Sequence, residues 1–313
     1  MPSEHFFITG GMGCIGAWVI RNLVQTDVSV TVFDLSTANH RLELIMSEDE
    51  RARAQFIRGD ITDTAAIGKA IADSGATHII HLAALQVPFC KANPPLGAAV
   101  NVVGTVNIFE AAQKCGLRQV VYASSVAVFG HKDEYDTAPL ADDALLHPHT
   151  LYGVYKQANE GTARVYWQDA GIASVGVRPY TIYGPGRDQG MTSTPTQAML
   201  AAARGEDFHI AFGGTMQLHY ASDVALQILA AAEEPCQGAL AFNLGGTPVA
   251  VSDVALAIMA ERPGVTITCA DTLLPFPIGC DDSALRAHTT HVYETPLATG
   301  VAATIAAFTQ LNR

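Results

Sequence analysis

Phe6-Phe7-Ile8-Thr9-Gly10-Gly11-Met12-Gly13-Cys14-Ile15-Gly16-Ala17-Trp18 is the stretch that decides the fold of this chain. An apolar run leads into a glycine-rich turn, and the turn leads into helical periodicity. Gly10 allows a sharp turn after a strand, Gly13 lets the backbone approach a pyrophosphate, and Gly16 lets the helix pack tightly. The free N–H groups and the positive dipole end of the helix would face the phosphates. The stretch therefore predicts a dinucleotide-binding turn.

An acidic residue at the end of the next apolar run supports this prediction. Asp34 ends Val30-Thr31-Val32-Phe33-Asp34 and can accept hydrogen bonds from both ribose hydroxyls of adenosine. Its carboxylate would repel a 2′-phosphate, and the two residues that follow carry no positive charge. We therefore expect NAD rather than NADP, with Arg41 the one nearby cation that weakens the argument. The alternative role for Asp34 is a helix N-cap.

Strand-like and helix-like segments alternate through the first part of the chain. Continuous apolar strands between amphipathic helices predict an α/β fold, a Rossmann-type doubly wound parallel sheet with both faces covered. We expect residues 1–184 to form the NAD-binding domain, with about 215–250 returning to it, and 185–313 to form mainly a small substrate-binding lobe. The expected strands are 5–8, 28–33, 54–58, 77–82, 118–123 and 173–178, and the expected helices are 14–25, 63–73, 95–114 and 151–169.

Composition limits the class of protein and its partners. Of the 313 residues 49% are hydrophobic, and the formal net charge is −12, which argues against nucleic acid or an anionic membrane as partner. The 6 cysteines show no paired spacing, so we expect reduced thiols and a cytoplasmic location. No signal peptide is expected before the first strand, and no apolar run is long enough to cross a bilayer.

The third and fourth strand ends carry further candidates for the cofactor. Asp60 could accept a hydrogen bond from the adenine amine, and the small residues after the fourth strand would allow close approach. Asp63 is expected to cap the next helix, and His81 is expected to be a structural histidine rather than a base. The cofactor candidates at these strand ends are Asp60, Ile61, Leu82, Ala83 and Ala84.

Hydroxyl groups follow the fifth strand, at the edge where open parallel sheets bind ligands. Ser124 and Ser125 end this strand, and Tyr152 and Lys156 come later at a spacing that places them on one face of a helix. The lysine cation and a nicotinamide cation would lower the pKa of the phenol from its usual value of about 10. Ser125 could bond the same substrate oxygen. The pattern predicts a Ser–Tyr–Lys site that removes a proton from an alcohol whose carbon loses hydride.

Taken together, these motifs resemble an extended short-chain dehydrogenase/reductase of the NAD-dependent epimerase/dehydratase family. The resemblance covers nearly the whole chain and is far more specific for the family than for the reaction. The residues that carry it are Thr9-Gly10-Gly11-Met12-Gly13-Cys14-Ile15-Gly16, Asp34, Gly59-Asp60, His81-Leu82-Ala83-Ala84, Asn101-Val102-Val103-Gly104-Thr105, Ser124-Ser125, Tyr152 with Lys156, Arg178-Pro179-Tyr180-Thr181-Ile182-Tyr183-Gly184-Pro185-Gly186-Arg187, and Thr295-Pro296-Leu297 to Phe308.

The resemblance implies roles for the matching residues. Tyr152 would be the acid/base, Lys156 would bind the nicotinamide ribose and tune Tyr152, and Ser125 would hold the reacting oxygen. Asn101 would order the active-site helix through its backbone and a water, and Tyr180 would lie near the nicotinamide amide. A homodimer through the helices of 95–114 and 151–169 is also implied. NAD would be bound by Gly10, Gly13, Cys14, Ile15, Gly16, Asp34, Asp60, Ile61, Leu82, Ala83, Ala84, Ser124, Tyr152, Lys156 and Tyr180.

Departures from the family pattern narrow the reaction. Val126-Ala127 replace the acidic pair of the 4,6-dehydratases, and no cysteine stands beside Ser125 as in the fucose-synthase type. Thr181 stands where nucleotide-sugar enzymes usually carry an asparagine, and Met216 where they usually carry an arginine. Because an arginine fork is the natural grip for a diphosphate, we expect a substrate without a nucleotide, unless another arginine substitutes.

A polar loop that begins at Arg187 follows Gly184-Pro185-Gly186 and could hold a small polyol, sugar or sugar acid. Arg187 is the candidate for a carboxylate, but Arg187 or Arg204 could also replace the missing diphosphate grip. The alternative is a purely structural loop whose hydroxyls cap the next helix and whose arginine is paired locally. The substrate candidates are Gln86, Ser125, Thr181, Arg187, Thr192 and Ser193.

Two histidine pairs, His147-Pro148-His149 and His288-Thr289-Thr290-His291, have a spacing that suggests metal ligands. Neither pair comes with the carboxylate or thiol set that a metal site needs. We therefore expect solvent-exposed histidines and no metal.

Three hypotheses of function follow from these observations. The first is an NAD-dependent dehydrogenase that oxidises a secondary hydroxyl of a small non-nucleotide sugar, polyol or sugar-acid derivative. The second is an epimerase of a sugar or nucleotide sugar, in which NAD stays tightly bound. Net NADH formation favours the first, and a new stereoisomer without net NADH favours the second. A non-catalytic NAD-sensing protein is the third, and the retention of Ser125, Tyr152 and Lys156 argues against it.

Overall fold

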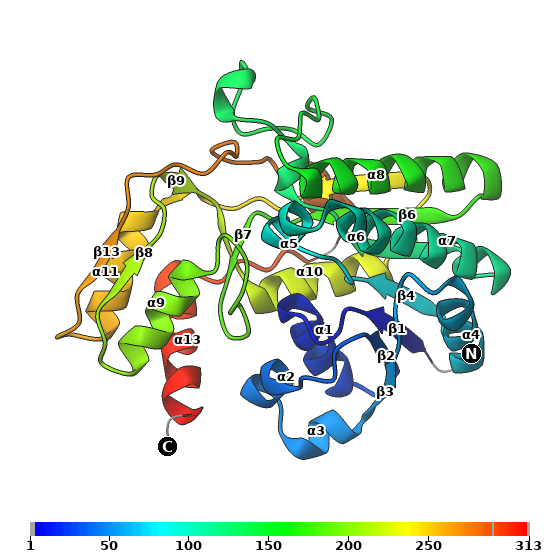
Figure 1. The fold of residues 1–313 in the computed structure, drawn as a ribbon, viewed down its shortest axis with the longest axis horizontal. Helices are drawn as coiled ribbons and strands as arrows, with labels where there is room; N and C mark the ends of the chain where they lie inside the picture. Colours follow the sequence, from blue (N-terminus) through cyan, green and yellow to red (C-terminus); the bar gives the residue numbers. More distant parts are fainter. Residues whose placement is uncertain (1–3, 290, 312–313) are drawn as a thin grey trace.

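A seven-stranded parallel sheet forms the centre of the computed structural model, which describes residues 4–289 and 291–311 (Figure 1). The strand order is β3-β2-β1-β4-β5-β6-β11, so the chain winds outward from β1 in both directions. This order confirms the predicted doubly wound Rossmann-type sheet. The strands are β1 His5–Thr9, β2 Ser29–Asp34, β3 Ala54–Arg58, β4 His78–His81, β5 Gln119–Ala123, β6 Ala173–Arg178 and β11 Ala239–Asn243.

Helices cover both faces of the sheet, because the strand side chains that point to one face and those that point to the other are both largely apolar. Phe6 and Ile8 of β1 pack with helices α1 (Cys14–Val24) and α10 (Ala221–Glu233), whereas Phe7 packs on the opposite face. On that second face lie α4, α7 and α8. Their bounds are Thr64–Ser74, Gly104–Lys114 and Leu151–Ala170.

Side chains at the helix ends explain where several helices begin and end. Asp63 accepts hydrogen bonds from the N–H groups of Ala65 and Ala66, at 3.0 and 2.9 Å, which confirms it as the cap of α4. Thr150 Oγ1 accepts from Gly153 N at 3.0 Å and so fixes the start of α8. The shorter helices of this domain are α2 His40–Ile45, α3 Glu48–Ala52, α5 Val87–Ala92, η2 Val126–Val128 and η3 Lys132–Glu134.

The helix expected over 95–114 is interrupted by one wider turn. Helix α6 (Pro94–Ala98) leads into the π-helical segment η1 (Ala99–Val103), and α7 follows. In η1 the side chain of Asn101 reaches the backbone of Leu85: its amide donates to Leu85 O at 3.0 Å and its oxygen accepts from Leu85 N at 2.9 Å. Single π-turns of this kind occur frequently at functional sites.

A second lobe is built from short strands and helices around a core of its own, to which α9, α11 and α13 contribute (Figure 1). Between these segments the chain returns to the first domain, where α10 packs on α1 and β11 pairs with β6. We keep the division into 1–184 with about 215–250, and 185–313, as a proposal that this packing supports. The elements are β7 Thr181–Tyr183, α9 Thr194–Ala203, β8 Phe208–Ile210, β9 Thr215–Met216, β10 Leu218–Tyr220, β12 Val249–Ala250, α11 Val251–Glu261, β13 Ile267–Cys269, α12 Ser283–His288 and α13 Leu297–Leu311.

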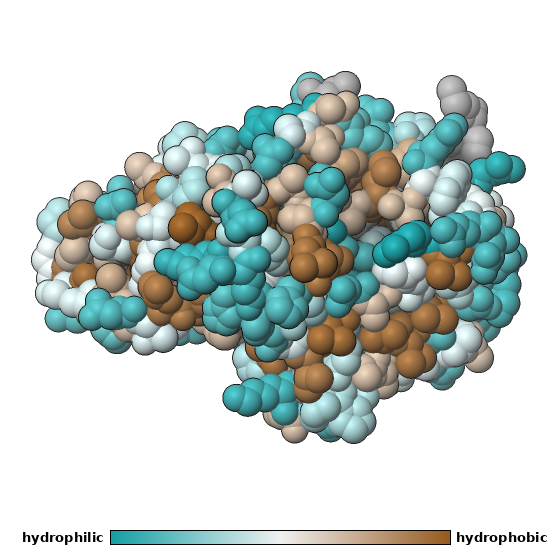
Figure 2. Space-filling model, turned by 90° about the horizontal axis from the view of Figure 1, so that it is seen from above, coloured by the Kyte–Doolittle hydropathy of each residue, from teal (hydrophilic) through white to brown (hydrophobic). Residues whose placement is uncertain are grey.

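The surface seen from above carries apolar groups among polar ones (Figure 2). Several of the large exposed apolar side chains belong to the helical layer of α5–α8, namely Phe89, Leu96, Val103, Leu151, Val154 and Val165. Within the described ranges, no helix combines the length and the apolar character needed to span a membrane.

Candidate active site

The glycine turn after β1 has the shape that its sequence predicts. Gly10 has φ +73°, and a Cβ placed on it would lie 2.5 Å from Ala83 N. A Cβ on Gly16 would lie 2.4 Å from Gly10 O, so this glycine lets α1 begin close against the turn. At Gly13 a Cβ would lie 3.1 Å from Gly10 O. The three glycines leave a cradle of bare backbone at the start of α1.

An outer cavity of about 320 Å³ extends from this cradle to the ends of β2 and β3. Asp34 lines it, and its carboxylate accepts from Met12 N at 2.9 Å and from Ser36 N at 2.8 Å. Asp60 lines it too, with its Oδ1 turned toward Thr62 N at 2.8 Å. The cavity could hold an adenosine against two carboxylates. The other predicted cofactor residues on its wall are Gly10, Gly13, Cys14, Ile61, Leu82, Ala83 and Ala84.

Arg41, the cation that weakened the choice of NAD, lines the outer cavity but is engaged elsewhere. Its Nη2 lies 2.7 Å from Asp188 Oδ1, and its Nη1 donates to Met12 O at 2.7 Å. The Asp188 carboxylate therefore already balances the charge of Arg41. This arrangement favours NAD over a cofactor with a 2′-phosphate.

An inner cavity of about 200 Å³ adjoins the outer one and contains the predicted chemistry. Ser125, Tyr152 and Lys156 lie on its wall, brought together from the end of β5 and the first turns of α8. The two cavities share Gly10, Gly13, Cys14, Leu82, Ala84, Gln86 and Arg187. The further predicted residues on the inner wall are Ile15, Gly16, Ser124, Tyr180, Thr181 and Thr192.

The pKa of Tyr152 is raised, although two groups of the site act against the rise. Burial raises the pKa of the phenol, while the Ser125 hydroxyl and the guanidinium of Arg187 lower it. The Lys156 ammonium lies 5.6 Å from the centre of the Tyr152 ring and donates to Ala123 O at 2.6 Å. Tuning of the phenol by Lys156 and a nicotinamide cation stays a prediction. Arg187 is a further cation whose charge lowers the pKa of Tyr152, and the sequence did not reveal it.

Burial also changes Lys156 itself. The amine is removed from water, which lowers its pKa to about 8, although the thiol of Cys90 and the carboxylate of Glu160 act in the opposite direction. A lysine with this pKa carries its proton at neutral pH but can lose it under mildly basic conditions.

Arg187 and Gln86 present unsatisfied polar atoms at the junction of the two cavities. Arg187 Nη2 donates to Thr192 Oγ1 at 3.0 Å, whereas its buried Nε has no hydrogen-bond partner in the described part of the chain. The buried Oε1 of Gln86 is likewise unpaired among the described residues. Burying polar groups without partners is costly, so these atoms indicate a place where a ligand completes the bonding. Asp188 follows Arg187 directly in the sequence and carries the nearest carboxylate along the chain. This carboxylate pairs with Arg41 and His40.

A buried ion pair behind the site was not foreseen from the sequence. Arg178, the last residue of β6, holds Glu160 of α8 through two bonds, Nε to Oε1 at 2.8 Å and Nη2 to Oε2 at 2.7 Å. The Ser124 hydroxyl donates to the same Glu160 Oε1 at 2.5 Å, so the ion pair engages this hydroxyl. Arg178 also donates to Asp142 O at 2.8 Å and to Asn243 Oδ1 at 3.3 Å. These bonds fasten the catalytic helix to the strand ends.

Several other predicted residues have structural partners. His81 is a structural histidine as expected, held between the hydroxyls of Thr9 at 2.7 Å and Thr105 at 3.0 Å, and burial lowers its pKa to about 3. The Asn101 side chain binds the loop at Leu85 and so positions part of the cavity wall. The role expected for Asn101 through its backbone and a water stays a prediction.

Residues where the two lobes meet differ in how they face the inner cavity. The Tyr180 hydroxyl donates to Pro277 O, which joins the sheet to the second lobe. Thr181 Oγ1 lies 3.4 Å from the sulfur of Met216, and Met216 is buried in the core of the second lobe. Ser193, a predicted substrate residue, turns its hydroxyl to Gly190 O at 2.9 Å and serves the loop itself.

The expectation that no carboxylate accompanies His147 and His149 is wrong. Glu134 lies between them, 2.7 Å from His147 Nδ1 and 2.6 Å from His149 Nε2. The carboxylate comes from a separate part of the same loop, so the spacing of the histidines could not reveal it. For the pair at 288–291, Thr290 lies outside the described residues.

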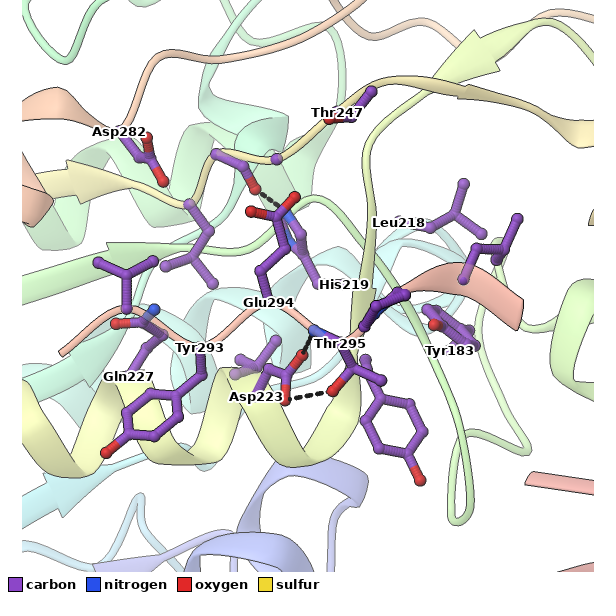
Figure 3. A pocket seen from close by; sticks show the side chains of 18 of the residues that line it. Tyr183, Leu218, His219, Asp223, Gln227, Thr247, Asp282, Tyr293, Glu294 and Thr295 are labelled. Atoms are coloured by element: carbon purple, nitrogen blue, oxygen red, sulfur yellow. Dashed lines mark hydrogen bonds between the residues drawn. The ribbon is translucent and has the colours of Figure 1, made fainter. Parts of the chain in front are cut away.

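A third cavity of about 380 Å³ lies beside α10, between the short strands β7 and β10 and the segment that precedes α13 (Figure 3). Asp223, Asp282 and Glu294 give its wall an acidic character. Asp223 accepts from Thr295 N at 2.5 Å and Thr295 Oγ1 at 2.9 Å, and Arg286 pairs with Asp282 at 2.8 Å. This charge balance is unfavourable for a diphosphate.

Comparison with known proteins places these features in context. Residues 6–245 match the NAD dependent epimerase/dehydratase family. The UDP-glucose 4-epimerase of Mycolicibacterium smegmatis is 29% identical over 244 residues, 76% of each chain. A structure of UDP-glucose 4-epimerase from Thermotoga maritima with UDP-glucose has a TM-score of 0.85 at 21% identity, covering 99% of this chain and 100% of that one. A partial consensus L-threonine 3-dehydrogenase also reaches 0.85 at 22% identity, covering 98% and 100%. These two structural likenesses are likenesses of fold.

Proposed function

This chain belongs to the NAD-dependent epimerase/dehydratase family, and we propose that within it the protein oxidises a secondary hydroxyl of a small sugar acid, sugar or polyol that carries no nucleotide. It is an NAD-dependent enzyme of the extended short-chain dehydrogenase/reductase type. The observation that carries the proposal is the partly buried Arg187 near Tyr152, whose buried Nε, like the nearby Gln86 Oε1, is unpaired among the described residues.

The outer and inner cavities suit NAD. The cradle at Gly10, Gly13 and Gly16 would take the pyrophosphate, because a Cβ at Gly10 or Gly16 would collide with backbone atoms there. Asp34 would accept the adenosine ribose hydroxyls. Bound NAD supplies the acceptor for a hydride. The remaining steps belong to the side chains of this chain.

Proton transfer would fall to Tyr152, with Ser125 holding the substrate oxygen against it. Arg187 favours the phenolate of Tyr152, which offsets part of the effect of burial. Lys156 is anchored on Ala123 O and keeps a positive charge next to the tyrosine ring at neutral pH. The site thus offers a base, an oxygen-binding hydroxyl and two cations.

A carboxylate is the group that best satisfies Arg187. The guanidinium can bond a carboxylate through Nε and one terminal nitrogen, and Gln86 could accept from a substrate hydroxyl. The inner cavity measures about 200 Å³ and must hold the nicotinamide as well, which favours a small substrate. A small hydroxy acid such as a sugar acid meets both conditions.

The alternative is an epimerase, including one that acts on a nucleotide sugar. It is supported by the relative from Mycolicibacterium smegmatis, which is a UDP-glucose 4-epimerase. Two observations weigh against it. The position expected to carry a diphosphate-binding arginine is the buried Met216, in contact with Thr181. The neighbouring third cavity is acidic.

The test compares substrates at the NADH absorbance band. Purified protein and NAD are mixed with sugar acids, with the polyols and free sugars of matched stereochemistry, and with UDP-sugars. We expect steady NADH formation with a free acid. Arg187→Met should lower kcat/KM for that acid by about 100-fold or more, the cost of losing a charged pair of hydrogen bonds of about 1.5–3 kcal/mol each.

The matched control is Arg204→Met, which removes an arginine that is exposed at the end of α9. It should leave the rates unchanged. A UDP-sugar converted to its epimer, seen by NMR without net NADH, would overturn the dehydrogenase proposal and establish the alternative. If Arg187→Met lowers the rates on acids and on polyols equally, the proposal that Arg187 binds a substrate carboxylate is wrong.

We also propose that the protein is a homodimer. The apolar side chains of Leu151, Val154 and Val165 are exposed on α8, and Leu96 and Val103 are exposed on the neighbouring helical layer. Exposed apolar groups gathered in this way mark an interaction surface. Sedimentation should give a dimer for the native chain and a monomer for Val154→Asp; a monomeric native chain would contradict the proposal.

A further inference from the structure

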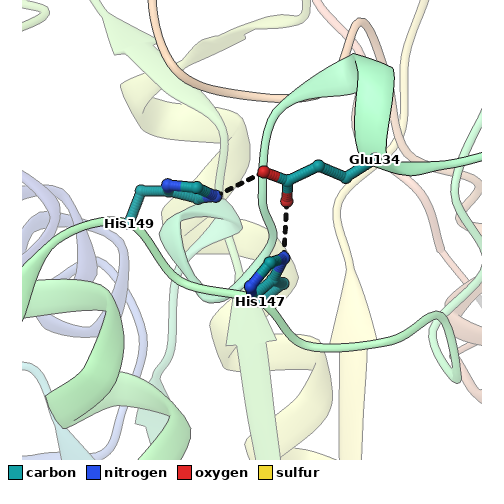
Figure 4. Close-up of side chains that lie close together, drawn as sticks. All are labelled: Glu134, His147 and His149. Carbon is teal, nitrogen blue, oxygen red and sulfur yellow. Dashed lines mark hydrogen bonds and ion pairs between the residues drawn. The ribbon is translucent and has the colours of Figure 1, made fainter.

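The loop between η2 and α8 projects from the body of the molecule and draws three possible metal ligands together (Figures 1 and 4). Glu134 Oε2 lies 2.7 Å from His147 Nδ1, and Glu134 Oε1 lies 2.6 Å from His149 Nε2. One ligand atom from each of the three side chains lies within 4.8 Å of the others. This cluster is outside both the outer and the inner cavity.

Backbone contacts hold the cluster in place. His147 N donates to Val128 O at 2.9 Å, and the Tyr135 hydroxyl accepts from Gly130 N at 2.8 Å and donates to Leu145 O at 2.9 Å. A Cβ on Gly130 would lie 1.9 Å from Glu134 Oε2, so the glycine makes room for the carboxylate. The three ligands are therefore oriented by the fold of the loop rather than by chance exposure.

Two imidazoles and a carboxylate are the donor set of first-row transition metals. Zinc prefers this combination, with bonds of about 2.0–2.1 Å, whereas magnesium and calcium prefer oxygen alone. In a tetrahedral site the ligand atoms stand about 3.3 Å apart, so the side chains need to separate only slightly from their hydrogen-bonded distances. The centre of the His131 ring lies 4.7 Å from the centre of the His149 ring, so a third imidazole packs beside the cluster.

We propose that Glu134, His147 and His149 form a zinc site at the surface, separate from the NAD-dependent chemistry. On binding, the metal replaces the protons that the two imidazoles now donate to the carboxylate, and each proton moves to the other ring nitrogen or to solvent. The metal ties the segment around Glu134 to the one that leads directly into α8. Since Thr150 caps α8 and Tyr152 lies in its first turn, zinc should stabilise the start of the catalytic helix.

The test is calorimetric titration of the untagged, chelator-treated full chain with zinc chloride and, separately, with magnesium chloride. We expect one zinc ion bound per chain, no magnesium binding, and a rise in melting temperature with zinc. Glu134→Gln and His147→Ala should each weaken zinc binding by more than about tenfold, since even outer-sphere partners of a metal are worth that much.

His209→Ala is the matched control, because His209 is also exposed and lies on β8 in the second lobe. Its zinc affinity should equal that of the native chain. Circular dichroism and NAD binding show that each variant is folded. No zinc binding by the native chain overturns the proposal. Unchanged binding by a His147→Ala/His149→Ala variant also overturns it and would assign the zinc to other side chains, such as the thiols.

Discussion

The buried pair of Glu160 and Arg178 should be decisive for both stability and catalysis. Both side chains are almost inaccessible to water, with exposed fractions of 6% and 4%, and two bonds of 2.8 and 2.7 Å join them. Glu160→Gln leaves the Arg178 charge buried without its counter-charge. Breaking a buried pair from one side costs about 3–5 kcal/mol. Glutamine keeps one acceptor oxygen, so we expect a loss of about 3 kcal/mol.

Urea unfolding followed by circular dichroism measures this loss. The variant Glu160→Gln/Arg178→Met should be less damaged than the sum of its single changes, by up to about 3 kcal/mol, because it removes both charges. Asp73→Asn is the matched control, since Asp73 forms an exposed pair with Lys69 at 2.6 Å and should cost less than about 1 kcal/mol. A cost for Glu160→Gln no larger than that of the control, or strict additivity in the double variant, would refute the reasoning.

The pH dependence of kcat/KM is a second test of the role of Glu160 and Arg178. The negative charge of Glu160 helps to keep Lys156 protonated against the burial that lowers the pKa of that amine to about 8. Removal of this charge should lower the pKa further. The basic limb of the kcat/KM profile should therefore move to lower pH in Glu160→Gln. An unshifted profile would mean that Lys156 does not control that limb.

Three further predictions follow from the site and its supports. Asp34→Ala should reduce the preference for NAD over NADP by at least about tenfold, measured as the ratio of dissociation constants, because carboxylate–phosphate repulsion exceeds about 1.4 kcal/mol; an unchanged ratio would contradict this. Gly16→Ala should abolish NAD binding in a folded chain, since its Cβ would lie 2.4 Å from Gly10 O; quenching of tryptophan fluorescence by NAD at native strength would contradict it. Burial lowers the pKa values of His81 and His219 to about 3 and about 4. Between pH 6.5 and those values, these two histidines are therefore protonated in the unfolded chain but not in the folded chain. The free energy of unfolding should then be highest above pH 6.5 and fall on acidification by up to about 1.4 kcal/mol per pH unit for each histidine. Urea midpoints that do not change from pH 7 to pH 5 would contradict this.

Local patterns predicted the elements and the glycine turn well. Most strands of the first domain are apolar runs, and such runs are stable where both faces of a sheet are buried. Strand β3, at the edge of the sheet, is the exception, because Gln55 and Phe56 are exposed. The spacing of Tyr152 and Lys156 defines one helix face in any context. Asp63 as a cap and His81 as a structural histidine also followed from their immediate neighbours.

Interactions between distant parts of the chain could not be predicted from the sequence. Nothing near Tyr152 indicates that Arg187 tunes it, and nothing near His147 indicates Glu134. Ser193 carries a suitable hydroxyl, but its neighbours in space use it for structure. A polar side chain takes whichever partner burial leaves within reach, and that choice depends on the whole fold.

By itself, the sequence determined the parallel sheet, the glycine cradle and the Ser–Tyr–Lys set, because periodicity and short spacings control backbone form and helix faces. Only the tertiary structure decided the environment of those groups. It placed a cation beside Tyr152, an ion pair behind Lys156 and a carboxylate between two histidines. These outcomes require segments far apart in the chain to meet, and electrostatic energies depend on the distance and burial reached when they do.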